Sequence, residues 1–180
     1  MTEAIVIRIT GDSGDGVQLV GEQLTITAAL KGRDVRTLPD FPAEIRAPAG
    51  TVAGVSGFQL AMSESTLFTA GESLDVLVAL NPAALKHSLQ YLNQGGLLII
   101  NEDSYQDKDW QKAGLDRSFL DDNAEFYQIL SFPLITQSSA AVASCALTKP
   151  QAVKTKNFYV LGLVLWLFDL PVEYCQNFIA

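Results

Sequence analysis

A glycine-rich stretch near the start of the chain, ITGDSGDGVQLVGEQL at residues 9–24, has the composition of a ligand-binding turn between a strand and a helix. Its first three glycines are Gly11, Gly14 and Gly16. Such glycines allow a tight turn that a ligand can approach closely, and the free amides of the following helix attract anions. Asp12 and Asp15, however, place two carboxylates in the same turn, where they would repel a phosphate. These acids could cap the helix, or accept hydrogen bonds from a ligand rich in amides and hydroxyls.

The spacing of the glycines differs from that of the known nucleotide motifs. A dinucleotide fingerprint requires G-x-G-x-x-G, and Ser13 stands where its second glycine belongs. A Walker loop requires a lysine in the turn, and the first lysine of the chain is Lys31. Gly14-Asp15-Gly16 matches the first half of a thiamine diphosphate motif, but the asparagine that completes it is missing, since the first asparagine is Asn81. A purely structural turn and a turn for another ligand both remain open.

A second loop, DFPAEIRAPAGTVAGVSG at residues 40–57, contains three glycines and two prolines and shows no hydrophobic periodicity. Ordered loops of this length in compact domains are usually functional. Glu44 and Arg46 are the only charged residues between Asp40 and Glu64. They could be plain surface charges or a mutual ion pair, whereas an arginine in such a loop could also bind a phosphate or a carboxylate.

Apolar strands alternate with helical patterns along the chain, which predicts an α/β fold. The expected strands are residues 4–9, 34–38, 58–63, 74–80, 95–102 and 125–130, and the expected helices are 16–30, 82–94, 133–147 and 156–170. We therefore expect a doubly wound, mostly parallel sheet of about six strands with helices on both faces. The first two strands should form a right-handed parallel crossover. If these strands are neighbours, the loop at 40–57 adjoins the glycine turn.

Composition narrows the possible partners. The net charge is −8, with 12 lysines and arginines, so nucleic acid is disfavoured as a partner. With two cysteines, Cys145 and Cys175, and one histidine, His87, the chain cannot by itself supply a four-cysteine iron–sulfur cluster or a zinc finger. Its longest apolar stretch, at 158–168, is about half of a membrane span, and the N-terminus lacks the features of a signal peptide. We expect a cytoplasmic protein that does not bind a membrane.

Two segments, GDSGDGVQLVGEQLTITAALKG at 11–32 and DFPAEIRAPAGTVAGVSGFQLAMSE at 40–64, closely resemble the gamma-type domain of 2-oxoacid:ferredoxin oxidoreductases. The second segment is most similar to the N-terminal part of the alpha subunit of the 2-oxoglutarate enzymes. A third segment, KNFYVLGLVLWLF at 156–168, resembles a late region of the same family. The resemblance implies that residues 1–180 are a single gamma-like domain, forming the N-terminal part of a longer alpha subunit.

The resemblance also implies an activity and its participants. The family oxidatively decarboxylates a 2-oxoacid, here favoured to be 2-oxoglutarate, to an acyl-CoA and reduces ferredoxin. Thiamine diphosphate, magnesium and 4Fe-4S clusters would lie on the remaining alpha-subunit domains and the beta subunit, and ferredoxin would be an indirect partner. This domain would help to bind coenzyme A. The residues that match the family's glycine turn and the following loop are Gly11, Asp12, Gly14, Asp15, Gly16, Glu44 and Arg46.

Two other functions compete with this one. The domain could be a scaffold of the same complex that binds no small molecule, or it could be a stand-alone nucleotide-binding oxidoreductase, which the glycine spacing disfavours. No residue of this domain is expected to be catalytic, and none to bind a metal. His87 is expected to be a surface or packing residue of its helix. Lys156 and Asn157 either begin the last long helix or take part in a ligand or interface contact.

Overall fold

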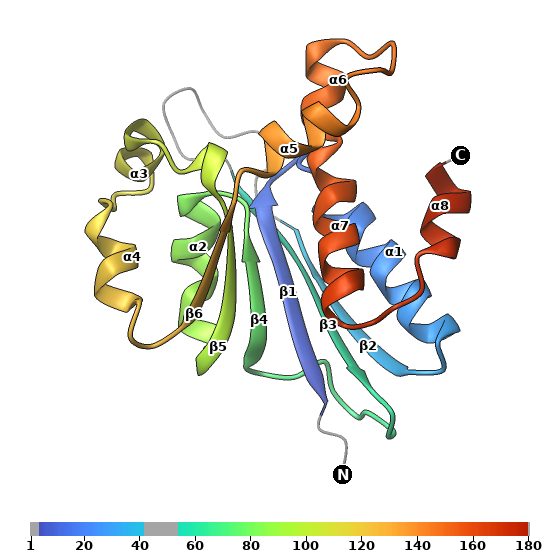
Figure 1. Ribbon diagram of the computed structural model, residues 1–180. Helices are drawn as coiled ribbons and strands as arrows, with labels where there is room; N and C mark the ends of the chain where they lie inside the picture. The colour runs from blue at the N-terminus through green and yellow to red at the C-terminus, as the bar shows by residue number, and fades with distance from the viewer. Residues whose placement is uncertain (1–3, 42–53, 180) are drawn as a thin grey trace.

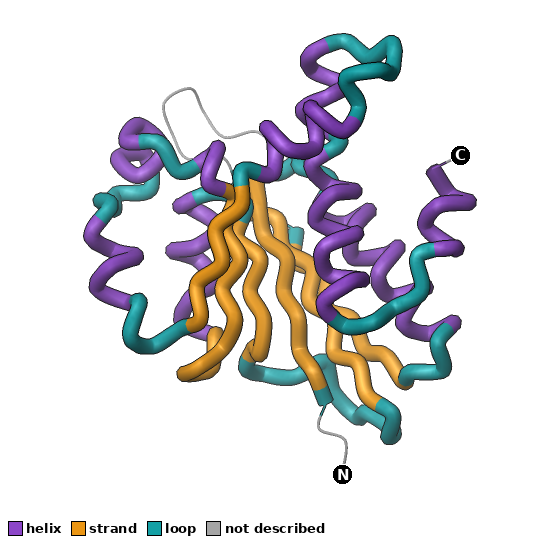
Figure 2. Tube along the Cα trace, viewed as in Figure 1, coloured by secondary structure: helices purple, strands orange, loops and turns teal. Residues whose placement is uncertain are grey.

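The computed structural model describes residues 4–41 and 54–179. It contains a six-stranded sheet in the order β2-β3-β1-β4-β5-β6 with helices on both faces (Figures 1 and 2). The strands are β1 (Ile5–Asp12), β2 (Asp34–Asp40), β3 (Val55–Ser63), β4 (Leu74–Ala79), β5 (Leu92–Asn101) and β6 (Gln128–Phe132). The helices are α1 (Val17–Leu30), α2 (Pro82–Ser88), α3 (Asp107–Lys112), α4 (Ser118–Asn123), α5 (Leu134–Ala141), α6 (Lys149–Lys154), α7 (Lys156–Leu167) and α8 (Glu173–Ile179), with short 3-10 turns η1 (Leu89–Tyr91) and η2 (Glu102–Ser104).

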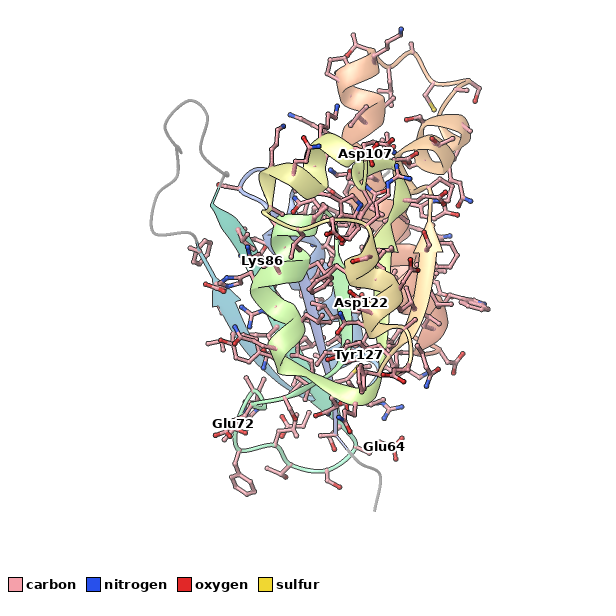
Figure 3. All side chains as sticks on the ribbon, turned by 90° about the vertical axis from the view of Figure 1, so that its left-hand side faces the viewer. Glu64, Glu72, Lys86, Asp107, Asp122 and Tyr127 are labelled. Carbon is pink, nitrogen blue, oxygen red and sulfur yellow. The ribbon has the colours of Figure 1, made fainter. Side chains whose placement is uncertain are left out.

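Two hydrophobic layers hold the sheet between its helices. On one face, α1, α7 and α8 pack on β1, β3 and β4, with residues such as Leu24, Ile9 and Val164 buried among them. On the other face, α2 and α3 pack on β4 and β5 through residues such as Leu85 and Trp110. Figure 3 views this second face, where the Lys86 ammonium of α2 donates a hydrogen bond of 2.8 Å to the carbonyl at the end of α3. The central strands are continuously apolar because both of their faces are covered, and the predicted fold class is confirmed.

The first two strands run in the same direction, as predicted for their crossover, but they are not neighbours in the sheet. β3 lies between β1 and β2 and runs antiparallel to both, so the first strand–helix–strand unit skips one position in the sheet. Strand patterns define which segments are extended, but not their order across the sheet. Because β1 and β2 still run in the same direction, their carboxyl ends meet at one edge. There the Ser13 amide donates to the Gly54 carbonyl at 3.1 Å, so the end of the second loop does lie beside the glycine turn.

Several element boundaries differ from those predicted. The long helix expected after Pro82 stops at Ser88, and β5 begins at Leu92 after a 3-10 turn. β6 begins at Gln128 rather than at residue 125. Helix α6, which was not predicted, begins after Thr148, whose amide donates to the Gln151 side chain at 2.8 Å. This short helix lies at the carboxyl edge of the sheet, above the start of α7 (Figure 1).

Candidate functional site

The glycine turn connects β1 to α1 at the carboxyl edge of the parallel strands. Gly14 and Gly16 have φ angles of 97° and 72°, a left-handed conformation that strains residues with a Cβ atom. A Cβ atom at Gly16 would also overlap the side-chain amide of Asn157 on α7. At Gly14, a Cβ atom would meet nothing within 4 Å. The turn is therefore closed against α7 at Gly16 and open at Gly14.

The two acids of the turn do not cap α1. The N-cap is Gly16, and within residues 4–41 and 54–179 no side chain accepts a hydrogen bond from the first turn of the helix. Asp15 instead accepts a charged hydrogen bond of 2.9 Å from the Lys156 ammonium through Oδ1, with side chains that are 21% and 10% exposed. Its second oxygen, Oδ2, accepts from the Asp12 amide at 3.2 Å. Asp15 thus stabilises the turn and attaches it to α7.

Asp12 links the glycine turn to the start of α2. Its Oδ1 accepts a hydrogen bond of 2.7 Å from the Asn81 side chain, and the Asn81 side-chain oxygen caps α2 by accepting from the Ala84 amide at 2.9 Å. Burial, reinforced by the nearby charge of Asp15, raises the pKa of Asp12 above its ordinary value. The half-buried Asp12 therefore gains a proton more readily than an ordinary aspartate does.

A cavity of about 480 Å³ opens between the turn and the α6–α7 segment. Its lining residues are Gly14, Asp15, Lys149, Pro150, Val153, Lys154, Lys156 and Asn157. The lining contributes three ammonium groups and one carboxylate, so the cavity is basic although the whole chain is acidic. Asn157 adds a buried Oδ1 atom that has no hydrogen-bond partner among the residues described. The charges of its lining therefore allow the cavity to attract an anion.

Five of the seven residues predicted for the site lie together in the turn between β1 and α1. They are Gly11, Asp12, Gly14, Asp15 and Gly16. The other two, Glu44 and Arg46, lie outside the described residues. Sequence reasoning missed Lys149 and Lys154 and treated Lys156 and Asn157 as minor candidates. The observation that could have revealed them is that three of the 12 basic residues of this acidic chain lie between positions 149 and 156.

The chain belongs to the pyruvate ferredoxin/flavodoxin oxidoreductase family, whose model matches residues 6–180. Among curated proteins, it is 41% identical over 178 residues to the 2-oxoglutarate oxidoreductase subunit KorA of Mycobacterium tuberculosis. That match covers 98% of this chain and 27% of KorA, so the chain spans about a quarter of its relative.

Solved structures share the fold. The 2-oxoglutarate:ferredoxin oxidoreductase of Magnetococcus marinus, solved with 2-oxoglutarate, coenzyme A and succinyl-CoA bound, aligns with a TM-score of 0.73 at 20% identity, over 98% of this chain and 26% of that one. The gamma subunit of a keto/oxoacid ferredoxin oxidoreductase from Geobacter sulfurreducens aligns with a TM-score of 0.68 at 19% identity, over 97% and 82% of the two chains. The pyruvate oxidoreductase subunit PORC of Thermotoga maritima gives 0.60 at 18% identity, over 98% and 84%.

Within residues 4–41 and 54–179, no group of three or more histidine, cysteine or acidic side chains is arranged to hold a metal ion. Of the two cysteines, Cys145 is exposed and Cys175 is buried, and both are free thiols. None of the helices in the described part of the chain is long and apolar enough to cross a membrane.

Proposed function

We propose that this chain is the gamma-like domain of a CoA-acylating 2-oxoacid:ferredoxin oxidoreductase, forming the N-terminal part of a longer alpha subunit. The oxoacid favoured is 2-oxoglutarate, converted to succinyl-CoA, because the KorA relative is named for that substrate. Residues 1–180 alone would be inactive. The assembly would be cytoplasmic, combining this domain with the remaining alpha-subunit domains and a beta subunit, and ferredoxin would accept its electrons.

Within this assembly, the domain would help to bind coenzyme A. The observation that carries this part is the basic cavity beside the glycine turn, since coenzyme A is a polyanion and the chain as a whole is acidic. Its volume, about 480 Å³, lies in the range of small-ligand pockets. The position also fits, because ligands of open α/β sheets bind at the carboxyl ends of the strands.

The expectation that both acids of the turn contact the amides of coenzyme A needs refinement under this proposal. Asp15 already accepts hydrogen bonds through both of its oxygens. Asp12 uses Oδ1 for Asn81, which leaves Oδ2 as the oxygen that could accept from a pantetheine amide. Thiamine diphosphate, magnesium and the iron–sulfur clusters would be held by other domains and by the beta subunit, where they would supply decarboxylation and electron transfer.

Calorimetric titration of the intact oxidoreductase with coenzyme A tests this proposal. Gly14→Ala would place a methyl group in the cavity that Gly14 lines, and we expect it to weaken binding by about tenfold, which corresponds to roughly 1.4 kcal/mol. Gly32→Ala is the matched control. Gly32 has a similar φ of 85° and equally open surroundings, but it lies between α1 and β2, at the opposite edge of the sheet.

Equal affinity of both variants for coenzyme A would contradict the proposed binding role and favour a scaffold domain. A stand-alone nucleotide-binding oxidoreductase would instead bind NAD, and we expect no heat of binding when NAD is titrated. Glu44 and Arg46 remain predicted contacts. For Arg46→Ala, we expect a higher Michaelis constant for coenzyme A or for the oxoacid.

A further inference from the structure

Helix α7 carries apolar residues on all of its sides, since no charged residue occurs between positions 157 and 168. One side, which includes Val164, is buried against the sheet and α1. The opposite side, which we call the outer face, consists of Tyr159, Gly162 and Trp166. Trp166 is 75% exposed, and no described segment crosses in front of the middle of the helix in Figure 1. A helix that is apolar on all sides is usually buried on all sides, so we expect a partner on the outer face.

The middle of α7 holds a glycine that the described part of the fold does not require. Gly162 has an ordinary helical backbone rather than the left-handed conformation that favours glycine. A Cβ atom at this position would meet nothing within 4 Å. Glycine destabilises the interior of a helix relative to alanine. Since neither the backbone conformation nor packing within the described residues calls for it, the glycine fits the close approach of another molecule from outside.

Trp166 supplies a side chain that can fill the space that Gly162 leaves. It lies one turn after Gly162 on the same side of the helix, about 6 Å further along the axis. When two copies of α7 cross antiparallel about a two-fold axis midway between these positions, Trp166 of each copy lies over Gly162 of the other. Rows of residues four positions apart form the ridges that pack into the grooves of a neighbouring helix. The outer face is therefore complementary to itself, as an isologous interface requires.

The charges beyond the two ends of α7 favour the antiparallel arrangement. Each copy has a net charge of −8, and the uncharged outer face keeps the repulsion between two copies low. The segment before α7 presents Lys149 and Lys154, which are exposed. The segment after it presents Asp169 and Glu173, also exposed, of which Asp169 pairs with Lys31 of its own chain. Antiparallel helices bring the basic end of each copy toward the acidic end of the other, whereas parallel helices would bring like charges together.

We propose that the outer face of α7 is a self-association surface, on which α7 of a second copy of this chain packs antiparallel, with Trp166 of each copy over Gly162 of the other. In the proposed oxidoreductase, two alpha subunits contact each other through this domain. The inference goes beyond the proposed function and does not depend on what the cavity beside the glycine turn binds.

Disulfide trapping in the intact oxidoreductase tests this arrangement. Two alpha subunits with different affinity tags are co-expressed, one with Gly162→Cys and the other with Trp166→Cys, and assemblies are purified through both tags. Both subunits also carry Cys145→Ser, because Cys145 is exposed whereas Cys175 is buried. The mixed pair keeps one native contact between Trp166 and Gly162 and sets the two introduced thiols opposite each other, within the roughly 7 Å between Cα atoms that a disulfide requires. We expect mild oxidation to link most of the purified pairs.

Leu30→Cys combined with Trp166→Cys is the matched control for trapping. Leu30 on α1 is also apolar and is 64% exposed, but it lies outside the outer face. Under the same oxidation, this pair of subunits should stay unlinked.

Sedimentation of the intact oxidoreductase measures the strength of the contact. Trp166→Ala should raise the dissociation constant between the two copies by about tenfold or more, as the loss of a buried interface tryptophan usually does. Gly162→Leu should do the same by filling the space beneath the partner's tryptophan, while its thermal unfolding temperature stays equal or rises, because leucine favours a helix more than glycine does. Phe68→Ala is the control, since Phe68 is 89% exposed between β3 and β4, and it should leave the dissociation constant unchanged.

A mixed pair that is linked no more often than the Leu30 control would overturn the proposal. Trp166→Ala and Gly162→Leu variants that keep the wild-type dissociation constant would also overturn it, as would an oxidoreductase that contains a single copy of this chain. A linked pair in an enzyme that does not bind coenzyme A would support the self-association surface and contradict the proposed binding role, so the two proposals can fail separately.

Discussion

Two strand-to-helix turns lie side by side at the same edge of the sheet, and they are completed in different ways. β1 and β4 are parallel neighbours, and each is followed by a helix. In the β4–α2 turn, Asn81 caps the helix with its side chain and Pro82 occupies a first-turn position. In the longer β1–α1 turn, Gly16 is the N-cap, and no side chain caps the helix.

The difference indicates which turn can receive a ligand. The polar groups of the β4–α2 turn are paired within the fold, because the Leu80 amide donates to the Thr10 carbonyl of β1 at 2.9 Å and the Tyr105 hydroxyl donates to the Ala79 carbonyl at 3.1 Å. The β1–α1 turn is held by Lys156 and Asn157 of α7, and among the described residues no side chain accepts from the amides of the first turn of α1. We call the β4–α2 turn the closed turn and the β1–α1 turn, which adjoins the basic cavity, the open turn.

The largest effect on stability is expected at the contact between the open turn and α7. Gly16→Ala adds a methyl group that overlaps Asn157 and also forces a left-handed φ, which together should cost roughly 2–4 kcal/mol. Gly32→Ala, where only the φ is unfavourable, should cost about 1 kcal/mol. Urea denaturation measures both values. Equal costs would show that the turn does not depend on close packing against α7.

The ion pair of the open turn should give the next largest effect. Lys156→Met leaves the mostly buried Asp15 carboxylate without its cation, and we expect a loss of roughly 1–3 kcal/mol, less than for a fully buried pair. A double-mutant cycle with Asp15→Asn isolates the interaction between the two side chains. A coupling energy indistinguishable from zero would mean that the pair does not hold the turn to α7.

The closed turn offers the converse test. Asn81→Ala removes the cap of α2 and should destabilise the protein by about 1–2 kcal/mol, whereas Asn81→Ser keeps a capping oxygen and should cost less. Asn81→Ser also keeps a hydroxyl that can donate to Asp12, so this variant should bind coenzyme A as the wild type does in calorimetry. A loss of coenzyme A affinity in Asn81→Ser would contradict the distinction between the two turns.

The smallest effect on stability is expected at Asp12, whose side chain links the two turns through Asn81. The raised pKa of Asp12 means that the folded state holds its proton more tightly than the unfolded state does. The resulting stabilisation is present below the ordinary Asp pKa of 3.8 and is lost as the pH rises through the raised pKa. Since an asparagine side chain cannot ionise, Asp12→Asn should gain stability relative to the wild type between pH 3.8 and neutrality. Denaturation across this range measures it, and a relative loss would contradict the sign.

The two turns also differ in how far the sequence could predict them. The closed turn was predictable, because an asparagine followed by a proline is a local pattern for the start of a helix. The open turn was predictable as a glycine-rich bend, but its main contact was not. Asp15 and Lys156 are separated by 141 positions, and no local pattern pairs them. The insertion of β3 between β1 and β2 was hidden for the same reason, because strand order depends on contacts between distant segments.

The most direct test is a crystal structure of the intact oxidoreductase with coenzyme A bound. We expect coenzyme A to lie in the basic cavity lined by Lys149 and Lys154 and to pass Gly14. Coenzyme A bound elsewhere, with the cavity between the glycine turn and α6 filled by another domain, would contradict the proposed site.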